Sequence, residues 1–182
     1  MKRLNGLSEL VARRNAISTE IAAILGRPAE LGHLGEFIAS VLFDIALEPS
    51  ATNRGFDGRF TKGLLSGKTV DVKTYAKREG IIDLRTKDLP DYYLVLSGPR
   101  SAAATSKGKG RPWVIDGIHL FDAKELVSSL LSRGLRVSVA TSVAAHYWTA
   151  AEVYPKQTCK LLELRPDQRS WVEAFGRHRA GA

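Results

Sequence analysis

The stretch Thr69-Val70-Asp71-Val72-Lys73-Thr74-Tyr75 decides how the rest of the sequence is interpreted. Apolar and polar residues alternate along it with a period of two, which is typical of a β-strand with two different faces. The alternation places Val70 and Val72 on one face and Asp71 and Lys73 on the other. The sequence therefore predicts a strand over residues 68–75 that carries a carboxylate and an ammonium group side by side.

Two helices are predicted before this strand. Over residues 7–25 apolar residues recur every three or four positions, and Gly26-Arg27-Pro28 ends this pattern with a glycine stop followed by a proline. A second apolar stripe of the same kind predicts a helix over residues 31–47. We therefore expect the chain to begin with helices and to continue into a sheet.

The remainder of the chain mixes strands and helices. Runs of apolar residues predict strands at 51–60, 80–84, 91–97, 113–121 and 137–141, with 91–97 in the centre of the sheet. Further helices are predicted at 123–133, with Asp122 as N-cap and Gly134 as its end, and at 142–153. This order favours an α/β or α+β fold in which helices flank a mixed central sheet.

Length and composition indicate one soluble domain over residues 1–182. Hydrophobic residues make up 44% and charged residues 25% of the 182 positions, as in ordinary globular proteins. No apolar run approaches the ~20 residues that cross a bilayer, so we expect no membrane partner. The single cysteine, Cys159, excludes an internal disulfide, and a reducing cytoplasm is the expected location.

The charge balance favours a polyanionic partner. The sequence holds 27 basic and 19 acidic residues, a net charge of +8, and such an excess attracts nucleic acid through counterion release. Within the domain we expect an N-terminal helical segment over 1–30, a flexible basic loop over 98–112 and a basic tail over 165–182. Basic loops are also common as solvated linkers, and this alternative stays open.

Three carboxylates and one lysine carry the predicted chemistry. Asp71 and Lys73 share a strand face, and Asp57 converges on them if its own strand forms a hairpin with theirs. Glu36 lies on the second predicted helix. Carboxylate oxygens are the ligands that hard divalent cations such as Mg²⁺ prefer. A bound cation polarises a phosphate and lowers the pKa of a water, while a neighbouring lysine stabilises the transition state. Metal-dependent phosphodiester hydrolysis requires this mixture.

The sequence resembles the restriction-endonuclease-like, or PD-(D/E)xK, nuclease superfamily over residues 31–100. Asp57 stands at the first acidic position, and Asp71-Val72-Lys73 matches the (D/E)xK element. Phe56 departs from the pattern, because the family has a proline before its first aspartate.

A closer resemblance, from Gly32 through Tyr93 to Trp113, is to an uncharacterised bacterial family, DUF6998. This second resemblance implies no function of its own.

The resemblance to the nuclease superfamily implies a fold, a reaction and a site. The fold is an αβββαβ core, here with an extra N-terminal helix. The reaction is hydrolysis of phosphodiester bonds, in DNA above all, by an endonuclease that uses Mg²⁺ or Mn²⁺ and can act as a homodimer. In the implied site Asp57 and Asp71 bind the metal, Glu36 supports it, and Lys73 assists catalysis.

Further side chains are candidates for contacts with nucleic acid. Three of them follow the predicted catalytic strand and three lie in the basic loop: Tyr75, Lys77, Arg78, Lys107, Lys109 and Arg111. Side chains of these types contact the phosphate backbone and fix its register without reading its sequence.

Each assignment has an alternative. Asp57-Gly58 can form a tight turn, Asp71 and Lys73 can form a solvated strand face, and Glu36 can be an exposed helix residue. The alternative functions are a non-catalytic DNA-binding protein, with residues 8–47 as a helix-turn-helix, and a pseudo-enzyme that keeps the nuclease fold as a scaffold.

Overall fold

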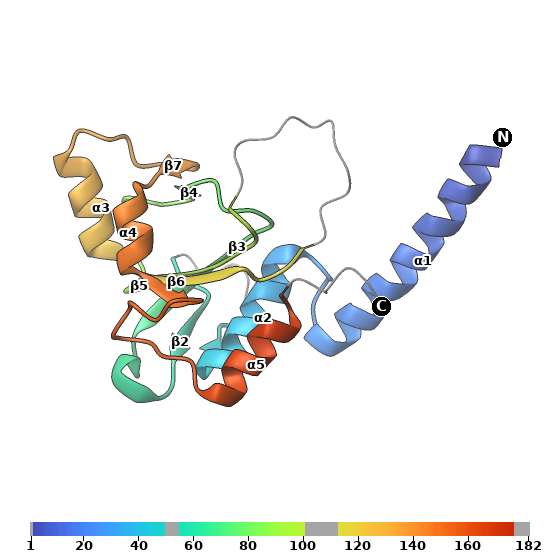
Figure 1. Cartoon of the computed structure of the whole chain (residues 1–182), viewed down its shortest axis with the longest axis horizontal. Helices are drawn as coiled ribbons and strands as arrows, with labels where there is room; N and C mark the ends of the chain where they lie inside the picture. Colours follow the sequence, from blue (N-terminus) through green and yellow to red (C-terminus); the bar gives the residue numbers. More distant parts are fainter. Residues whose placement is uncertain (1, 50–54, 101–112, 177–182) are drawn as a thin grey trace.

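The structure, a computed structural model, describes residues 2–49, 55–100 and 113–176 (Figure 1). Its strands are β1 (Ile45–Leu47), β2 (Gly58–Phe60), β3 (Thr69–Tyr75), β4 (Ile81–Ile82), β5 (Tyr92–Ser97), β6 (Gly117–Asp122), β7 (Thr141–Ser142) and β8 (Glu152–Tyr154). Its helices are α1 (Lys2–Leu25), α2 (Leu31–Phe43), α3 (Ala123–Ser132), α4 (Ala145–Ala150) and α5 (Pro166–Ala174), and a 3-10 turn, η1, spans Gly63–Leu65. The predicted mixture of a sheet and flanking helices is confirmed.

The central sheet runs in the order β1-β2-β3-β5-β6-β8, and a small second sheet pairs β4 with β7. Among the strands of the described residues, β3 and β5 pair in parallel and the other neighbouring pairs are antiparallel. A parallel pair needs a crossover connection, which is usually a helix. Here residues 76–91 make that connection without a helix and contain β4. The αβββαβ order expected from the family resemblance has a helix at this place, and this chain departs from it.

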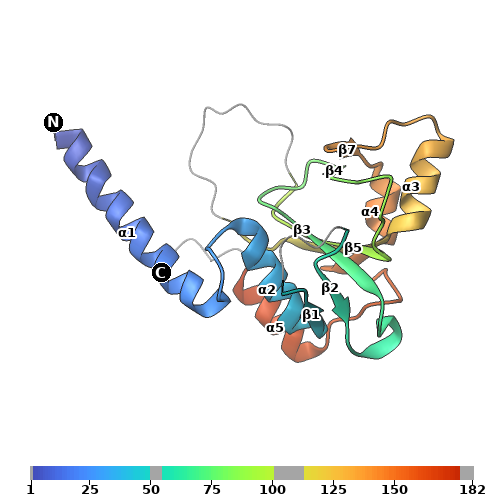
Figure 2. The same cartoon turned by 180° about the vertical axis from the view of Figure 1, so that it is seen from behind.

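Both faces of the central sheet are covered (Figures 1 and 2). On one face Val70 and Val72 of β3 belong to an apolar core that includes Leu42 of α2 and Val172 of α5. On the other face lies a second core, built from β5, β6, the inner sides of α3 and α4, and the segments next to β4 and β7. The chain therefore encloses its central sheet between two helical layers.

Register across the sheet aligns residues into rows on the second face. Asp71 of β3 lies opposite Tyr93 of β5, which lies opposite Phe121 of β6. The next row on this face is Lys73, Val95 and His119. The predicted placement of Asp71 and Lys73 on one strand face is thus confirmed, and on that face Asp71 is buried whereas Lys73 is partly exposed.

Three predicted elements have different bounds in the structure. The helix predicted over 31–47 ends at Phe43, because Asp44 adopts a left-handed conformation with φ 51° and the chain turns into β1. The helix predicted over 142–153 divides into the short helix α4 and strand β8. The basic tail predicted over 165–182 contains α5, because Val172 and Gln168 are buried against the core and Gln168 donates a hydrogen bond to the Leu42 carbonyl.

The remaining strands are shorter than predicted. Of the segment 51–60, residues 58–60 form β2, and residues 50–54 lie outside the described residues. The strands predicted at 80–84 and 113–121 are seen as β4 and β6, whereas the strand predicted at 137–141 is wrong for residues 137–140 and overlaps β7 only at Thr141. Most of the predicted basic loop, residues 101–112, also lies outside the described part of the chain.

The predicted N-terminal helix is present as α1, which projects from the body in both views (Figures 1 and 2). Among the described residues, no helix has the length and apolar character that crossing a membrane requires.

Candidate active site

The candidate site forms where β2 separates from β3. The register between these strands ends at Gly58 and Val70, and the Asp57 N–H donates to the Val70 carbonyl at 2.9 Å. Two residues further along β3, on the edge that faces β2, the Val72 N–H donates to Asp57 Oδ2 at 2.7 Å. A carboxylate oxygen thus takes the place of a backbone carbonyl, and this bond fixes the Asp57 side chain beside β3.

The alternative for Asp57-Gly58, a tight turn between two strands, is wrong. The chain reverses between β2 and β3 at residues 61–68, around η1, whereas Asp57 lies at the opposite end of β2. The backbone of Asp57 extends the β2 ladder in both directions, because its carbonyl also accepts from the Glu48 N–H at 2.8 Å.

Asp71 lies at the base of the site. Its side chain is 3% exposed, with Oδ1 2.7 Å from Lys73 Nζ and Oδ2 3.3 Å from the Nη2 atom of Arg85. The two cationic side chains lie nearer the solvent, since Lys73 is 21% and Arg85 42% exposed. A solvated strand face, the alternative for Asp71 and Lys73, is therefore wrong for Asp71.

The ionisation of both aspartates reflects this burial. Burial raises the pKa of Asp71 to about 6, as does the charge of Asp57, while Lys73 and Arg85 lower it. Burial also raises the pKa of Asp57, and the charge of Glu36 adds to this effect. The Val72 N–H, the Lys73 ammonium and a hydrogen bond with the Asp71 carboxyl lower the Asp57 pKa. Burial is the largest effect for both groups, so ionisation of the two carboxyls is less favourable here than in water.

Glu36 reaches the edge of the site but has a partner of its own. Its Oε2 atom lies 3.0 Å from the Nη1 atom of Arg27, and its side chain is 16% exposed. The Nη2 atom of the same arginine donates to the Glu48 carbonyl at 2.8 Å. Arg27 therefore connects the segment between α1 and α2 to the end of β1 and orients the Glu36 carboxylate. The alternative for Glu36, an exposed helix residue, is therefore wrong.

The donor set suits a hard cation such as Mg²⁺. Asp57 and Asp71 offer carboxylate oxygens next to one another, in surroundings that raise both pKa values and would favour a nearby cation. Mg²⁺ commonly uses one or two protein carboxylates and keeps several waters. Within the described residues, no group of three or more His, Cys, Asp or Glu side chains is arranged to hold a metal ion. Asp57 and Asp71 together offer the two carboxylates that this mode of Mg²⁺ binding uses.

The three candidates for nucleic-acid contacts that the structure describes have partners within the protein. The Tyr75 hydroxyl accepts from the Asp83 N–H at 2.9 Å, and Lys77 pairs with Glu79 at 2.5 Å. The Nη1 atom of Arg78 lies 2.9 Å from His119 Nε2. Lys107, Lys109 and Arg111 lie outside the described residues.

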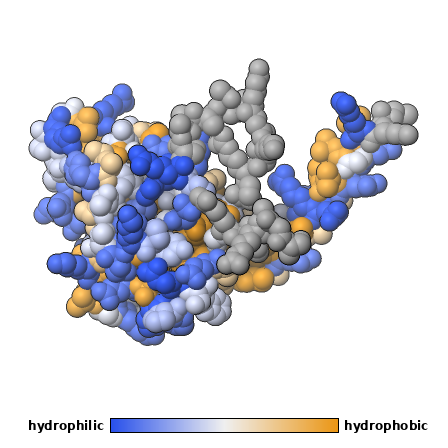
Figure 3. All heavy atoms as spheres, viewed as in Figure 1, coloured by the Kyte–Doolittle hydropathy of each residue, from blue (hydrophilic) through white to orange (hydrophobic). Residues whose placement is uncertain are grey.

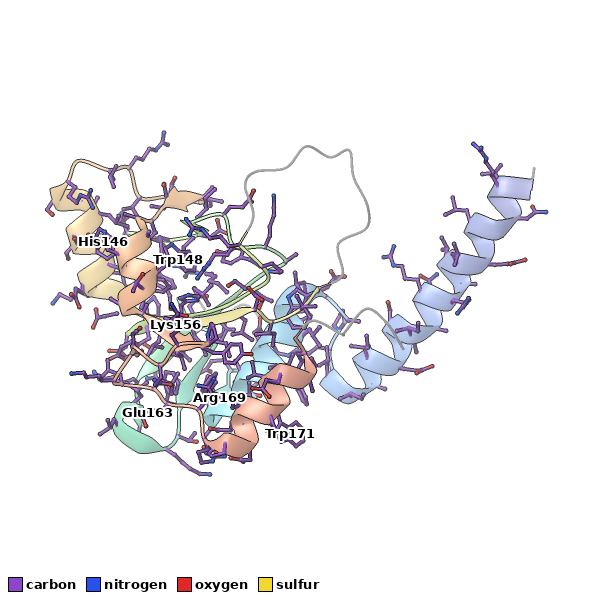
Figure 4. The ribbon with its side chains drawn as sticks, in the orientation of Figure 1. His146, Trp148, Lys156, Glu163, Arg169 and Trp171 are labelled. Atoms are coloured by element: carbon purple, nitrogen blue, oxygen red, sulfur yellow. The ribbon has the colours of Figure 1, made fainter. Side chains whose placement is uncertain are left out.

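Arg78, which is partly buried, contacts a second cluster on the same sheet face, formed by His119 and Trp148. Its guanidinium carbon lies 5.8 Å from the ring centroid of Trp148, which Figure 4 labels on α4. His119 packs edge to face against the same indole at 4.9 Å. Burial, with the Arg78 charge, lowers the pKa of His119 to about 3, so this imidazole is neutral. A cavity of about 550 Å³ adjoins Arg78 and Trp148 and does not include Asp57 or Asp71.

Sequence reasoning missed two arginines that act on the site. The sequence placed Arg27 at a helix end and in the turn of the helix-turn-helix alternative, and Arg85 follows β4 in a connection without a periodic pattern. In the sequence each of them is a single arginine in a segment between two elements. Such arginines are frequent, so the sequence alone does not indicate which carboxylate either one contacts.

The helix-turn-helix alternative would use α2 as its recognition helix. Ile38, Ala39 and Leu42 bury one side of the C-terminal half of α2 in the core, and Arg27 of the preceding turn contacts the Glu36 carboxylate and the Glu48 carbonyl. A recognition helix contacts the major groove with its N-terminal residues, so this burial does not decide between the two interpretations.

No protein-family model matches this sequence, and a search of the curated proteins finds no match either.

Proposed function

We propose that this protein is a Mg²⁺-dependent nuclease that hydrolyses phosphodiester bonds in DNA, with Asp57, Asp71 and Lys73 as its catalytic set. One observation carries the proposal: two carboxylates and a lysine converge where β2 separates from β3. The resemblance to the PD-(D/E)xK nucleases and the net charge of +8 support the same function.

Each side chain has a distinct role in this reaction. Asp57, fixed by the Val72 N–H, and Asp71, held at the base of the site, would bind the cation through their oxygens. When bound, Mg²⁺ supplies Lewis-acid activation of the phosphate and a water of lowered pKa. Lys73, positioned by Asp71 and partly exposed, donates toward the attacked phosphate and stabilises its developing negative charge.

Two further residues position this set. Glu36 acts on Asp57 through its charge, and the ion pair with Arg27 holds the Glu36 carboxylate in place. Arg85 occupies one oxygen of Asp71 at 3.3 Å and is 42% exposed, so this contact can open when a cation or a phosphate arrives.

The proposed activity is tested by cleavage of supercoiled plasmid in Mg²⁺, with Mn²⁺ as a second cation. We expect Asp71→Asn and Lys73→Ala each to lower the rate at least about 100-fold, because each removes a group that acts on the reacting phosphate. Lys62→Ala is the matched control, since Lys62 forms an ion pair with Asp44 at 2.8 Å on the surface. Equal cleavage by wild type and both site variants would contradict the assigned site, and preferential cleavage of an RNA of matched length would correct the substrate.

A pseudo-enzyme is the second candidate, and one observation favours it. The described residues provide no arrangement of three or more metal-ligating side chains, whereas Asp71 already has two cationic neighbours. Titration of Mg²⁺ and Mn²⁺ by calorimetry separates the two functions. A nuclease binds the cation in wild type and loses binding in Asp71→Asn, whereas a pseudo-enzyme shows no binding in either protein.

A further inference from the structure

Helix α1 carries an apolar stripe that is largely exposed, although Ile21, near its C-terminal end, is partly buried where the helix meets α2. Leu7, Leu10, Ile17 and Ile24 are 55%, 60%, 56% and 69% exposed. The helix projects from the body (Figure 1), and Figure 3 shows hydrophobic surface between charged side chains along it. Isolated helices are marginally stable in water, because most helical stability comes from packing an apolar face. A long helix of this composition is therefore expected to pack against a partner.

The spacing of the stripe is that of a coiled coil. Six residues follow one another at alternating intervals of three and four positions: Leu7, Leu10, Arg14, Ile17, Ile21 and Ile24. In heptad notation the first, third and fifth of them occupy a positions and the others occupy d positions. Arg14 is the single polar residue in this seam, and an arginine can pack its aliphatic stem while its guanidinium reaches solvent.

We propose that α1 pairs with α1 of a second copy of this chain as an antiparallel coiled coil. If Leu7 lies opposite Ile24 of the partner helix, the same alignment places Leu10 opposite Ile21. Each a residue then meets a d residue along the whole seam, as antiparallel pairing requires. The proposal is independent of the nuclease activity.

Charge selects this orientation. Arg13 and Glu20 both occupy g positions beside the seam, and antiparallel pairing brings g positions of the two helices together. Arg13 of each copy then faces Glu20 of the other, which forms two equivalent ion pairs. In a parallel pair, g positions face e positions, so Arg13 would meet Ser18 and Glu20 would meet Leu25. Only the antiparallel arrangement gives both charges an opposite partner.

The first test is the mass of the full chain in solution as a function of concentration. Sedimentation equilibrium should show the 19.9 kDa chain doubling its mass. Leu10→Glu with Ile17→Glu should give a monomer at every concentration, because two charges enter the seam of each helix. Ala12→Glu places the same charge on the opposite side of α1 and should leave the dimer intact. Circular dichroism checks that the body of each variant is folded.

The second test is a charge exchange across the pair. Arg13→Glu alone or Glu20→Arg alone should weaken dimerisation by about tenfold, since each places like charges against one another twice. The double exchange should restore the dissociation constant to within about threefold of wild type. A wild-type chain that stays monomeric, or a double exchange that is as weak as the single ones, would overturn the proposal. Binding of the monomer to vesicles of anionic phospholipid would assign the stripe to a membrane surface instead.

Discussion

The two faces of β3 are both buried, yet they have opposite chemistry. Toward α2, Val70 and Val72 are 0% and 6% exposed within an apolar core. Toward the other helical layer, Asp71 is 2% exposed and contacts Lys73 and Arg85. Burial of the valines lowers the free energy of the folded state, whereas burial of the aspartate raises it and shifts the Asp71 pKa upward. The face with Val70 and Val72 therefore stabilises the fold, whereas the burial of Asp71 on the other face, at the candidate site, destabilises it.

A comparison within the second face sharpens this point. His119 lies in the same row as Lys73 and is 0% exposed, but burial keeps its ring neutral, with a pKa lowered to about 3. Arg78 and Trp148 enclose this imidazole. The carboxyls of Asp57 and Asp71 instead interact with one another at the edge of the protein core. Burial of an ionisable group alone therefore does not define the candidate site, and the pairing of two carboxylates does.

The largest expected effect is on the apolar face of β3. Val72→Asp places a carboxylate in the apolar core next to α2, and we expect the free energy of unfolding to fall by at least about 3 kcal/mol, because the residues of this core give a charge no compensating partner. Urea denaturation measures the change, with Ser66→Asp as an exposed control. A fall in the free energy of unfolding of less than about 1 kcal/mol would show that the apolar face of β3 tolerates a charge, and the two faces of β3 would then not differ in this respect.

The next effect concerns the contact between α2 and the sheet. A Cβ atom added at Gly35 would lie 1.8 Å from Thr74 Oγ1, so Gly35→Ala forces α2 away from β3. We expect a loss of about 1–3 kcal/mol in the free energy of unfolding, partly restored by Thr74→Gly. Gly32→Ala on the same helix is the control, since a Cβ there meets nothing within 4 Å, and it should stabilise α2 by about 0.5–1 kcal/mol. Equal effects of the two alanines would argue against this close packing.

Removing the charge of Asp71, on the second face, should raise the free energy of unfolding. The pKa of Asp71 is raised to about 6 from an ordinary value of 3.8, so the folded state binds more protons than the unfolded state between these values. The stability that protonation gives is complete below about pH 4 and is lost as the pH rises through about 6. Asparagine cannot ionise, so the Asp71→Asn variant keeps this stability at high pH. We expect its free energy of unfolding at pH 8 to be about 1–3 kcal/mol higher than that of wild type. Thermal unfolding from pH 4 to pH 8 measures the difference, and a variant less stable at pH 8 would show that the ion pairs outweigh burial.

The smallest expected effect is at a surface ion pair. Lys62 is 73% exposed where it meets Asp44, so Lys62→Ala should change the free energy of unfolding by less than about 0.5 kcal/mol. Urea denaturation of this variant sets the baseline for the site variants. A change above about 1 kcal/mol would mean that exposed charges contribute to this fold more than such pairs usually do.

The alternation in β3 and the apolar run of β5 were sufficient to predict the centre of the fold. Asp122 accepts from the Glu125 N–H as predicted for the N-cap of α3, and Gly134, with φ 73°, follows its end. The strand β1 was not predictable, because Ile45 continues the apolar period of α2 and only the left-handed backbone at Asp44 ends that helix. The interior position of α5 was hidden by its charged sequence, in which Val172 is the main buried apolar residue.

The candidate site was predictable along one strand and much less so across strands. A period of two fixes the relation of Asp71 to Lys73, because both belong to β3. The position of Asp57 depends on where β2 separates from β3, and that depends on a hydrogen bond between a side chain and the Val72 amide. The ion pair of Glu36 with Arg27 depends on how a turn folds back on α2, which local patterns do not determine.

The central claim is that the buried carboxylates serve catalysis at the expense of stability. One preparation of Asp71→Asn, compared with wild type at pH 8 in Mg²⁺ for plasmid cleavage and without metal for thermal unfolding, tests it most directly. The account predicts a higher melting temperature together with a rate of cleavage at least about 100-fold lower. Cleavage at the wild-type rate by this folded variant would contradict the account.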